Sequence, residues 1–267
     1  MPISSRLSFF YAEKGSLELN GHAVVLRQSE NIIQFPVGAA CAILIEPGTT
    51  VTHAAVKACA DEGTLLLWVG EHGVRCYSAG NPGGANAEKI LLQASIRLDK
   101  QKHFKSASRI FTHMFGESPP HFRSIEQLRG MEGAKVRNRY QSLAKEAGIE
   151  WKGRDATNAL NTPLNLAISC GNAALYGLAE AVILALGYAP AIGMVHSGDP
   201  RSFVFDIADT VKFTTVVPMA MRLVKDSTES IEGRVRRACR DLFRESNMAE
   251  LLIDIIERIM SDDINGI

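Results

Sequence analysis

Three potential metal ligands lie within about fifteen residues of the sequence: a histidine, and then two aspartates three positions apart. His196 precedes a short turn that contains glycine and proline, and Asp206 and Asp209 follow on a predicted helix over 201–213. At about 100° per residue the two aspartates lie roughly 60° apart around that helix, with Cβ atoms about 5–6 Å from each other. Two carboxylates so close need a cation or several hydrogen bonds to remain ionised. The segment therefore indicates either a metal site, or two ordinary helix acids beside a loop histidine.

A fourth candidate, Glu132, lies between two glycines in the basic segment L-R-G-M-E-G-A-K-V-R-N-R-Y at 128–140. Lys135 and Arg139 share its face of a helix predicted over 123–147, so one interpretation is that Glu132 pairs with these two bases. The other is that an acid inside a basic patch holds a divalent metal ion against a phosphate. The sequence leaves both interpretations open.

Three predicted helical stretches carry more lysine and arginine than acid: 97–109, 123–154 and 222–244. Each lysine or arginine that contacts a nucleic-acid phosphate releases counterions and so strengthens binding. Any one stretch is consistent with a solvated helix face, but three in one helical region favour a surface for the DNA backbone. The expected phosphate ligands are Arg129, Arg139, Arg236 and Arg240 from these stretches, and Arg75, which precedes them in the sequence.

Composition excludes several classes of protein. The 267 residues, 46% of them hydrophobic, suffice for one large or two small globular domains. The formal net charge is zero, so any DNA binding must use local patches. The five cysteines are scattered without C-x-x-C spacing, which predicts reduced thiols of a cytoplasmic protein and not a zinc site. The apolar stretch 173–192 is interrupted by glutamate, glycine and proline, which favours a buried helix over a membrane span.

The periodicity of the sequence changes at the turn-rich segment 81–85, which begins Asn81-Pro82. Residues 1–80 show short β-branched and apolar runs, including a hairpin over 17–26 with a turn at Asn20-Gly21. Further strands are expected at 31–36, 40–46, 64–69 and 73–78, with one helix at 52–62. Residues 86–267 are predicted to be helical, with helices at 86–115, 123–147, 158–187, 201–213, 217–245 and 247–261. We therefore expect an α+β protein: a small β domain, a linker at 81–85 and a larger all-helical domain.

Long motifs in this chain resemble those of a known family. They are L-I-E-P-G-T-T-V-T-H-A-A-V at 44–56, H-G-V-R-C-Y-S-A-G-N-P-G-G-A at 72–85, G-x-E-G at 130–133, L-Y-G-L-A-E-A-x-I-L-A-L-G-Y-A-P-A-I-G at 175–193, H-S-G-D-P-x-S-F-V-F-D-I-A-D at 196–209 and K-F-x-T-V-V-P at 212–218. With these motifs the chain resembles the CRISPR-associated endonuclease and integrase of spacer acquisition, in its type I subtype E form. The resemblance covers nearly the whole sequence.

The resemblance implies a β-sandwich-like N-terminal domain and a helical catalytic domain. It also implies a homodimer that binds double-stranded DNA and assembles with a small ferredoxin-like CRISPR-associated partner. The family's activity is the insertion of short foreign DNA fragments into a CRISPR array by attack of 3′-hydroxyl groups, in antiviral defence. Its metal site falls on Glu132, His196 and Asp209, with Asp206 beside them.

Some positions depart from the family pattern. Asp199 stands in the turn after the histidine where related members carry lysine, which adds negative charge near the site. Lys14 stands where some members carry a tyrosine that opens a DNA fork, and Lys57 where arginine is expected.

The ligand types determine the expected chemistry. Two carboxylates and one imidazole suit Mn²⁺ or Mg²⁺, and are a poor set for a closed structural zinc site. Such an ion activates water or a DNA 3′-hydroxyl and stabilises the leaving oxygen. Asp206 either binds the ion directly or orients His196. The alternative is a helical DNA-binding scaffold without catalysis, in which these acids only favour the helix start.

Overall fold

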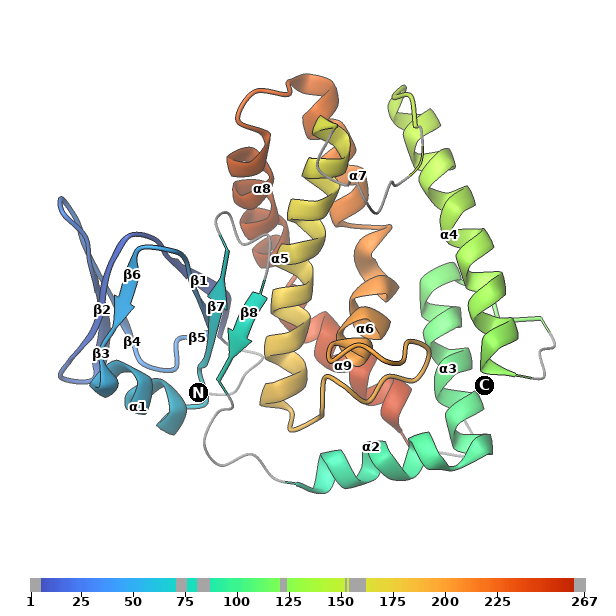
Figure 1. Cartoon of the computed structure of the whole chain (residues 1–267), viewed down its shortest axis with the longest axis horizontal. Coiled ribbons are helices and arrows are strands. Elements are labelled where there is room, and N and C mark those ends of the chain that lie inside the picture. Colours follow the sequence, from blue (N-terminus) through green and yellow to red (C-terminus); the bar gives the residue numbers. More distant parts are fainter. Residues whose placement is uncertain are drawn as a thin grey trace.

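The computed structural model describes residues 6–70, 76–80, 87–120, 124–151, 153 and 162–261. Within these residues a strand-rich N-terminal part precedes a helical C-terminal part (Figure 1), which confirms the predicted α+β class. The elements of the N-terminal part are β1 (Leu7–Ala12), β2 (Gly15–Asn20), β3 (Ala23–Arg27), β4 (Ile32–Pro36), β5 (Ala40–Ile45), β6 (Thr49–Val51), α1 (His53–Asp61), β7 (Leu65–Val69) and β8 (Cys76–Ala79).

These strands form two four-stranded sheets, with the orders β1-β5-β7-β8 and β4-β3-β2-β6. In the first sheet β1, β5 and β7 are parallel and β8 is antiparallel to β7. In the second sheet β2 and β3 form the predicted hairpin, with Asn20 opposite Ala23 and a positive φ of 60° at Gly21. Two strands, β1 and β6, are additional to the predicted ones. β6 has only three residues and depends on its parallel pairing with β2, which no local pattern indicates.

The buried faces of the two sheets share one hydrophobic cluster. Leu17 and Leu26 come from the second sheet, Ile43 and Ile45 from the first, and Cys59 comes from α1. All five side chains are almost fully buried, which is the expected result of apolar faces that would otherwise contact water. The two sheets and α1 therefore stabilise one another.

The described residues of the C-terminal part form helices. They are α2 (Glu88–Leu98), α3 (Lys100–Phe115), α4 (Ile125–Ala147), α5 (Pro163–Ala185), α6 (Ser202–Lys212), α7 (Val216–Asp226), α8 (Ile231–Glu245) and α9 (Met248–Met260). The predicted linker at 81–85 lies outside the described residues.

Two predicted helices are each divided into two. The stretch 86–115 breaks at Asp99, whose backbone is extended and whose carboxylate accepts the N–H groups of Gln101 and Lys102. An aspartate that caps a new helix competes with continuation of the old one. The stretch 217–245 breaks between α7 and α8, where Ser230 has a left-handed backbone with φ of 45°.

The central element of the C-terminal part is α5, which packs against α6, α7, α8 and α9 and also against β5 and β7 (Figure 1). Ala181 of α5 lies in one hydrophobic cluster with Leu44 and Leu67 of the first sheet. By length and composition α5 could cross a membrane, but 78% of its most apolar window is buried inside the protein. α5 is therefore the core helix that the interrupted apolar stretch predicts, and it joins the helices to the sheets.

A second connection between the two parts is ionic. Arg236 of α8 donates from Nη1 to Glu13, which follows β1, at 2.9 Å, and to Glu46, which follows β5, at 2.8 Å. Only 17% of the arginine side chain and 10% of the Glu46 side chain is exposed. Charges with so little solvent around them require these partners. Arg236 therefore fixes α8 against the first sheet.

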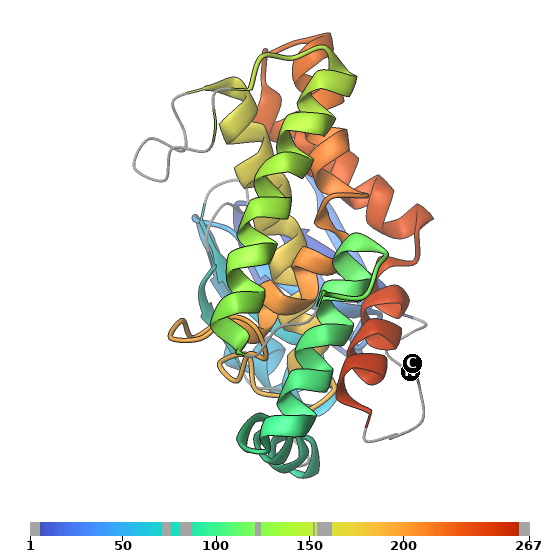
Figure 2. The same cartoon turned by 90° about the vertical axis from the view of Figure 1, so that its right-hand side faces the viewer.

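α4 covers the helical part on the side of α6 that faces away from the sheets. Both views place α3 beside the first turns of α4 (Figures 1 and 2). α4 begins at Ser124, whose side chain accepts the N–H of Gln127, and it ends at Gly148 in the left-handed conformation with φ of 69°. These are the favoured N-terminal and C-terminal signals of a helix. They fix where α4 begins, and therefore which part of α6 lies opposite Glu132.

Candidate metal centre

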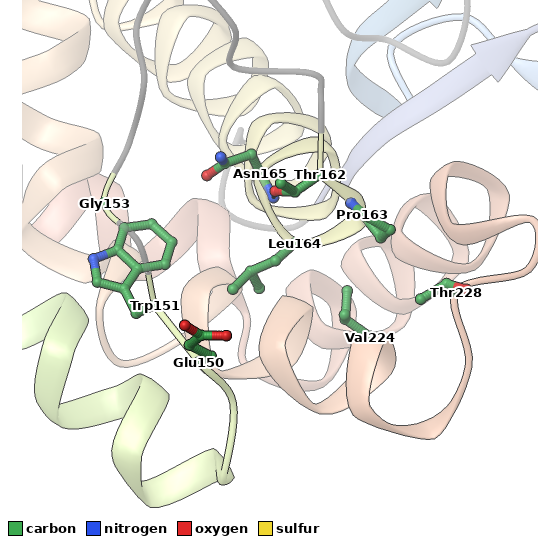
Figure 3. A pocket seen from close by; sticks show the side chains of 9 residues that line it. All are labelled: Glu150, Trp151, Gly153, Thr162, Pro163, Leu164, Asn165, Val224 and Thr228. Atoms are coloured by element: carbon green, nitrogen blue, oxygen red, sulfur yellow. The ribbon is translucent and has the colours of Figure 1, made fainter.

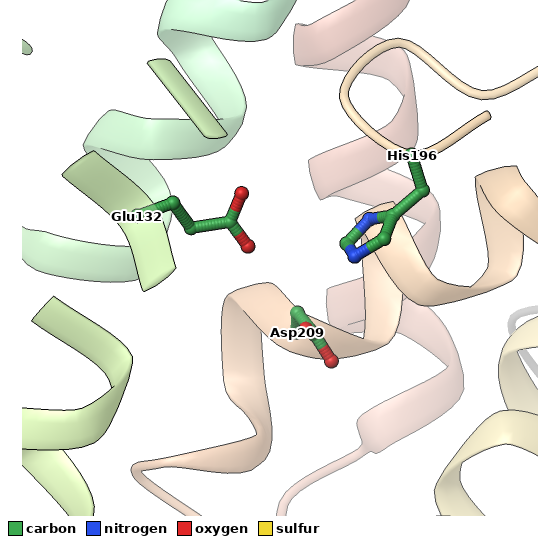
Figure 4. Close-up of side chains that lie close together, drawn as sticks. All are labelled: Glu132, His196 and Asp209. Atoms are coloured by element: carbon green, nitrogen blue, oxygen red, sulfur yellow. The ribbon is translucent and has the colours of Figure 1, made fainter. Parts of the chain in front are cut away.

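Three side chains that are distant in the sequence meet between α4 and α6. Glu132 comes from α4, His196 from the loop between α5 and α6, and Asp209 from α6 (Figure 4). Each offers one ligand atom, and these three atoms lie within 4.8 Å of one another. The structure therefore gathers the three residues that the resemblance implies as metal ligands into one cluster.

Asp206 is not one of the three clustered ligands and instead contacts the loop that carries His196. Its Oδ2 accepts the backbone N–H groups of Met194 at 2.5 Å and Val195 at 3.1 Å, and its Oδ1 accepts that of His196 at 2.9 Å. Oδ1 also lies 2.8 Å from His196 Nδ1. A carboxylate has about four acceptor positions, so these contacts occupy Asp206 fully. The whole residue is 1% exposed. Its geometry is that of a group that orients His196.

The contact with Asp206 sets the tautomer of His196. Because the carboxylate accepts, Nδ1 carries the proton and the lone pair of the neutral ring lies on Nε2. Nε2 is then the atom available to a metal ion, in the arrangement in which a carboxylate fixes a ligating histidine. The ring is also held edge-on by Phe205, with centroids 5.9 Å apart.

The loop that carries His196 passes so close to Asp206 that it needs glycine three residues before the histidine. A Cβ atom on Gly193 would lie 2.3 Å from the carbonyl oxygen of His196 and 3.0 Å from Asp206 Oδ2. Any larger residue would push the chain away from the carboxylate. Gly193 therefore allows the tight curve that places three amide groups around Asp206.

Asp209 has one engaged and one unengaged oxygen. Its Oδ2 lies 2.6 Å from Nζ of Lys212, one turn further along α6, and both side chains are over nine-tenths buried. Its Oδ1 is buried and has no hydrogen-bond partner among the described residues. Sequence reasoning did not single out Lys212, although its spacing of three residues from Asp209 is the available signal. The lysine offsets part of the negative charge of the cluster.

Burial and crowding alter the acidities of the cluster. Burial raises the pKa of Glu132, and the nearby Asp209 and Asp206 raise it further against the opposing charge of His196. For His196, burial is the largest single cause and lowers the pKa, but the hydrogen bond to Asp206 and the charges of Asp206, Asp209 and Glu132 together raise it above its usual value. Both groups therefore hold protons more tightly than usual in the metal-free protein.

These features fit a divalent cation. An oxygen that is buried without a partner is costly unless something binds it, and one of the three clustered residues, Asp209, has such an oxygen in Oδ1. Two carboxylates and one imidazole match the preferences of Mn²⁺ and Mg²⁺. The three residues can therefore hold such an ion, with Asp206 behind the histidine.

The surroundings of Glu132 do not fit the interpretation that it pairs with Lys135 and Arg139 of its own helix. Lys135 forms an ion pair with Glu117, and Arg139 is exposed. Glu132 is 8% exposed and its electrostatic neighbours are His196 and Asp209. Glu132 therefore faces the cluster and not the basic side of its own helix.

The five expected DNA contacts divide into three groups. Arg129, Arg139 and Arg240 are exposed. Arg236 is engaged with Glu13 and Glu46, as described above, and can contact a phosphate only in competition with them. Arg75 lies outside the described residues.

The negative charge of Asp199 is partly offset within its own turn. Its carboxylate accepts the N–H of Arg201 at 2.8 Å and lies 4.0 Å from Arg201 Nε. The guanidinium of Arg201 also lies over the ring of Phe205, 5.3 Å from its centroid. The turn that carries Asp199 therefore also carries a positive charge, beside the phenylalanine ring that packs against His196.

A pocket of about 330 Å³ lies elsewhere, where α4 ends and α5 begins (Figure 3). Its walls are mainly apolar and include Trp151, Leu164 and Val224. Glu132 lies in the second turn of α4, so the two sites are separated along that helix by roughly 20 Å at 1.5 Å per residue. The pocket is therefore not part of the metal cluster.

The sequence profile described as "CRISPR associated protein Cas1" matches residues 9–118 and 115–230 of the chain. The chain belongs to the Cas1 family.

Curated relatives in the Cas1 family extend over almost all of the chain. A CRISPR-associated endonuclease Cas1 from Escherichia coli is 45% identical over 269 residues, which cover 98% of this chain and 87% of the relative. The protein of the same name from Geobacter sulfurreducens is 44% identical over 266 residues, with the same coverage.

Solved Cas1 structures have the same fold. The crystal structure of a TtCas1–DNA complex matches with a TM-score of 0.75 and 35% identity, over 98% of this chain and 99% of that one. A Cas1 protein from Thermotoga maritima matches with a TM-score of 0.78 at 17% identity, over 97% and 99% of the two chains, which concerns the fold alone.

Proposed function

We propose that this protein is a divalent-metal-dependent DNA nuclease and integrase of the type I subtype E form, which inserts short DNA fragments into a CRISPR array. The observation that carries the proposal is the convergence of Glu132, His196 and Asp209 within 4.8 Å, with a buried, unpartnered oxygen on Asp209. The names of the curated relatives, which are CRISPR-associated endonucleases, support the same activity.

In this function the cluster holds Mg²⁺ or Mn²⁺, which supplies Lewis acidity toward a phosphate and lowers the pKa of a bound hydroxyl group. His196 contributes Nε2, and Glu132 and Asp209 contribute carboxylate oxygens. Asp206 keeps the proton on His196 Nδ1 and so keeps Nε2 available. Lys212 neutralises the second oxygen of Asp209.

The attacking group decides between the two reactions. When the oxygen of a DNA 3′-hydroxyl attacks phosphorus, a new P–O bond forms, the target strand's P–O3′ bond breaks, and the released 3′-oxygen takes up a proton. When water attacks, the same bond breaks and the product is a cut strand. The same three ligands serve both, because the two reactions develop the same charge at phosphorus.

The proposed assembly is a homodimer that binds double-stranded DNA in the cytoplasm, together with a small ferredoxin-like CRISPR-associated partner. The exposed Arg129, Arg139 and Arg240 are the proposed phosphate contacts, with Arg75 as a further candidate. A DNA complex of the related TtCas1 supports the binding of DNA. The two N-terminal sheets are proposed to form the β-sandwich-like domain of the family.

The test combines the purified protein with supercoiled plasmid that bears CRISPR repeats and with short duplexes, with and without Mn²⁺ and with and without the partner. Glu132→Gln, His196→Ala and Asp209→Asn are compared with wild type in strand transfer, cleavage and Mn²⁺ calorimetry. We expect each variant to lose activity by orders of magnitude while its affinity for DNA stays close to that of wild type. Arg27→Ala, an exposed change on β3, is the control.

Metal-dependent joining by wild type that is lost in all three variants would support an integrase. DNA binding without any metal-dependent cleavage or joining by wild type would instead support the non-catalytic scaffold. Variants that bind Mn²⁺ and join DNA as wild type does would show that these residues share no metal site.

A further inference from the structure

Outside the cluster, a buried histidine on α3 contacts the loop that carries His196. The Nε2 atom of His103 lies 2.7 Å from the carbonyl oxygen of Met194, two residues before the metal-ligand candidate. Its Nδ1 atom lies 3.2 Å from Nη1 of Arg97, at the end of α2. His103 is 8% exposed, and neither the cluster nor the proposed DNA surface includes it.

The partners of His103 fix its protonation state. A guanidinium has only donors, so Nδ1 must accept from Arg97 and the ring proton must lie on Nε2. That N–H then donates to the oxygen of Met194. Burial lowers the pKa of His103, and the charge of Arg97 lowers it further, although the bond to Met194 opposes them. The ring is therefore the neutral Nε2–H tautomer.

The peptide group that accepts the hydrogen bond of His103 is also hydrogen-bonded to Asp206. The carbonyl of Met194 and the N–H of Val195 belong to one planar trans peptide, so they point in opposite directions. His103 donates to the carbonyl at 2.7 Å, and Asp206 Oδ2 accepts the N–H at 3.1 Å. The peptide is thus clamped from both sides, with α3 on one side and α6 on the other.

The preceding part of the loop is held in the same way by α2. Gln93, which is fully buried, donates from Nε2 to the carbonyl oxygens of Ala189 at 3.1 Å and Ile192 at 2.7 Å. Its Oε1 accepts the N–H of Ala189 at 2.8 Å. The loop is therefore already ordered up to Ile192, and the peptide after Met194 is the last fixed point before His196.

We propose that His103 is a positioning residue for His196. Fixed by Arg97 as the Nε2–H tautomer, it holds the Met194–Val195 peptide so that the next amides reach Asp206 and the His196 ring presents Nε2 to Glu132 and Asp209. The inference rests on the proposed metal site, and His103 belongs neither to the three candidate ligands nor to the proposed phosphate contacts.

The experiment uses two substitutions of His103 that distinguish the role of Nε2 from that of Nδ1. The amide nitrogen of His103→Gln reaches the place of Nε2 and can still donate to Met194. The amide of His103→Asn is shorter, reaches only the place of Nδ1, and loses that bond. His113→Asn is the matched control, since His113 lies on the same helix and the charge that lowers its pKa is that of Arg258 on α9.

Two measurements use the full-length, metal-free protein: hydrogen exchange of the Val195 and His196 amides, and the ¹⁵N signals of the His196 ring. A third is Mn²⁺ affinity by calorimetry. We expect His103→Asn to accelerate both amide exchanges, to mix the His196 tautomers, and to weaken Mn²⁺ binding by about 10-fold, within the range for residues behind a ligand. His103→Gln should stay near wild type, and His113→Asn should match it.

Unchanged amide exchange and Mn²⁺ affinity in His103→Asn would overturn the proposal, and so would equal losses in the Gln and Asn variants. If His103→Asn does not fold, Arg97→Met tests the same clamp, because removal of the donor to Nδ1 frees the His103 tautomer and should produce the same changes in smaller measure. If wild type binds no Mn²⁺, the proposed function fails, whereas the exchange and ring signals still decide whether His103 holds the loop.

Discussion

At the residue scale, two aspartates three positions apart on α6 have different surroundings. Asp206 accepts three backbone N–H groups and the ring of His196, whereas Asp209 pairs with Lys212 and leaves one oxygen free for the cluster. Hydrogen bonds stabilise the charge of Asp206, and the buried ammonium of Lys212 stabilises one of the two oxygens of Asp209. The repulsion expected from their spacing is thereby relieved at both carboxylates in different ways.

Glu132→Gln should stabilise the metal-free protein at neutral pH. Because the pKa of Glu132 is raised in the folded state, its contribution to stability is present below its ordinary pKa of 4.5 and is lost as pH rises through the folded value. Glutamine keeps the shape of the side chain without the buried charge. At pH values above the folded pKa, the unfolding free energy of the variant should therefore exceed that of wild type by about 1.4 kcal/mol for each unit by which folding raises the pKa.

Urea unfolding of both proteins between pH 4 and pH 8 without metal is the measurement. The two curves should converge toward acid pH, and added Mn²⁺ should stabilise wild type only. A variant that is less stable than wild type at pH 7.5 would contradict this interpretation of Glu132.

Removal of the other buried acid of the cluster, Asp209, should destabilise the protein. Asp209→Asn leaves the ammonium of Lys212 buried without its counter-charge, and loss of one member of a buried ion pair costs about 3–5 kcal/mol. The double variant Asp209→Asn with Lys212→Met removes the unpaired charge and should recover much of the loss. Thermal unfolding of the two single variants and the double variant gives the coupling. Simple additivity of the single effects would mean that the pair is not coupled.

At the element scale, the glycines on either side of Glu132 place two poor helix formers inside α4. A Cβ atom at Gly130 or Gly133 would meet nothing within 4 Å, so packing does not require either glycine. Alanine at each should therefore stabilise the helix by about 1 kcal/mol. If instead the space is kept for a DNA strand beside the cluster, the same alanines should weaken DNA binding and slow strand transfer.

Gly148 provides the control, because it ends the same helix with a φ of 69° and alanine there should destabilise the protein. Melting temperature and duplex affinity are measured for all three variants. Alanines at 130 and 133 that stabilise the protein and leave DNA joining unchanged would show that the glycines do not serve DNA.

The exposed arginines of α4 lie on either side of Glu132 along the helix. At 1.5 Å per residue, Arg129 is about 4.5 Å before it and Arg139 about 10.5 Å after it. Arg129→Ala with Arg139→Ala should weaken binding to duplexes of any sequence, and should reduce the slope of log affinity against log salt by about 0.9 for each lost phosphate contact. Arg27→Ala on β3 should change neither. Unchanged affinity at low salt would exclude α4 from the DNA surface.

At the scale of the whole molecule, Arg236 and α5 connect the sheets to the helices. Arg236→Met leaves the largely buried carboxylate of Glu46 without that cation, and should lower the unfolding free energy by about 3 kcal/mol, as for other broken buried pairs. Arg240→Met, one turn further along α8, removes an arginine whose side chain is 58% exposed. It should leave the unfolding midpoint nearly unchanged. Equal midpoints for the two variants would show that Arg236 does not join the two parts.

Much of the architecture could be predicted because it depends on neighbours in the sequence. The turn at Asn20-Gly21 specifies its hairpin through local backbone preference, and most helices follow from periodicity. The two wrong helix assignments arose because apolar spacing continues across Asp99 and across the α7–α8 junction. There the capping carboxylate and a left-handed serine decide the backbone, and such competition is hard to see in a periodic pattern.

The sequence by itself determined which residues can bind a metal and which local spacing they have: His196, Asp206 and Asp209 in one segment, and Glu132 in another. Only the tertiary structure decided that Glu132 faces Asp209, that Asp206 serves the histidine loop, and that Arg236 binds two glutamates. Periodicity assigns a side chain to one face of its helix, but the packing of α4, α6 and α8 decides what lies opposite that face. Burial then determines whether a charge is solvated or must find a partner, and burial is a property of the assembled elements.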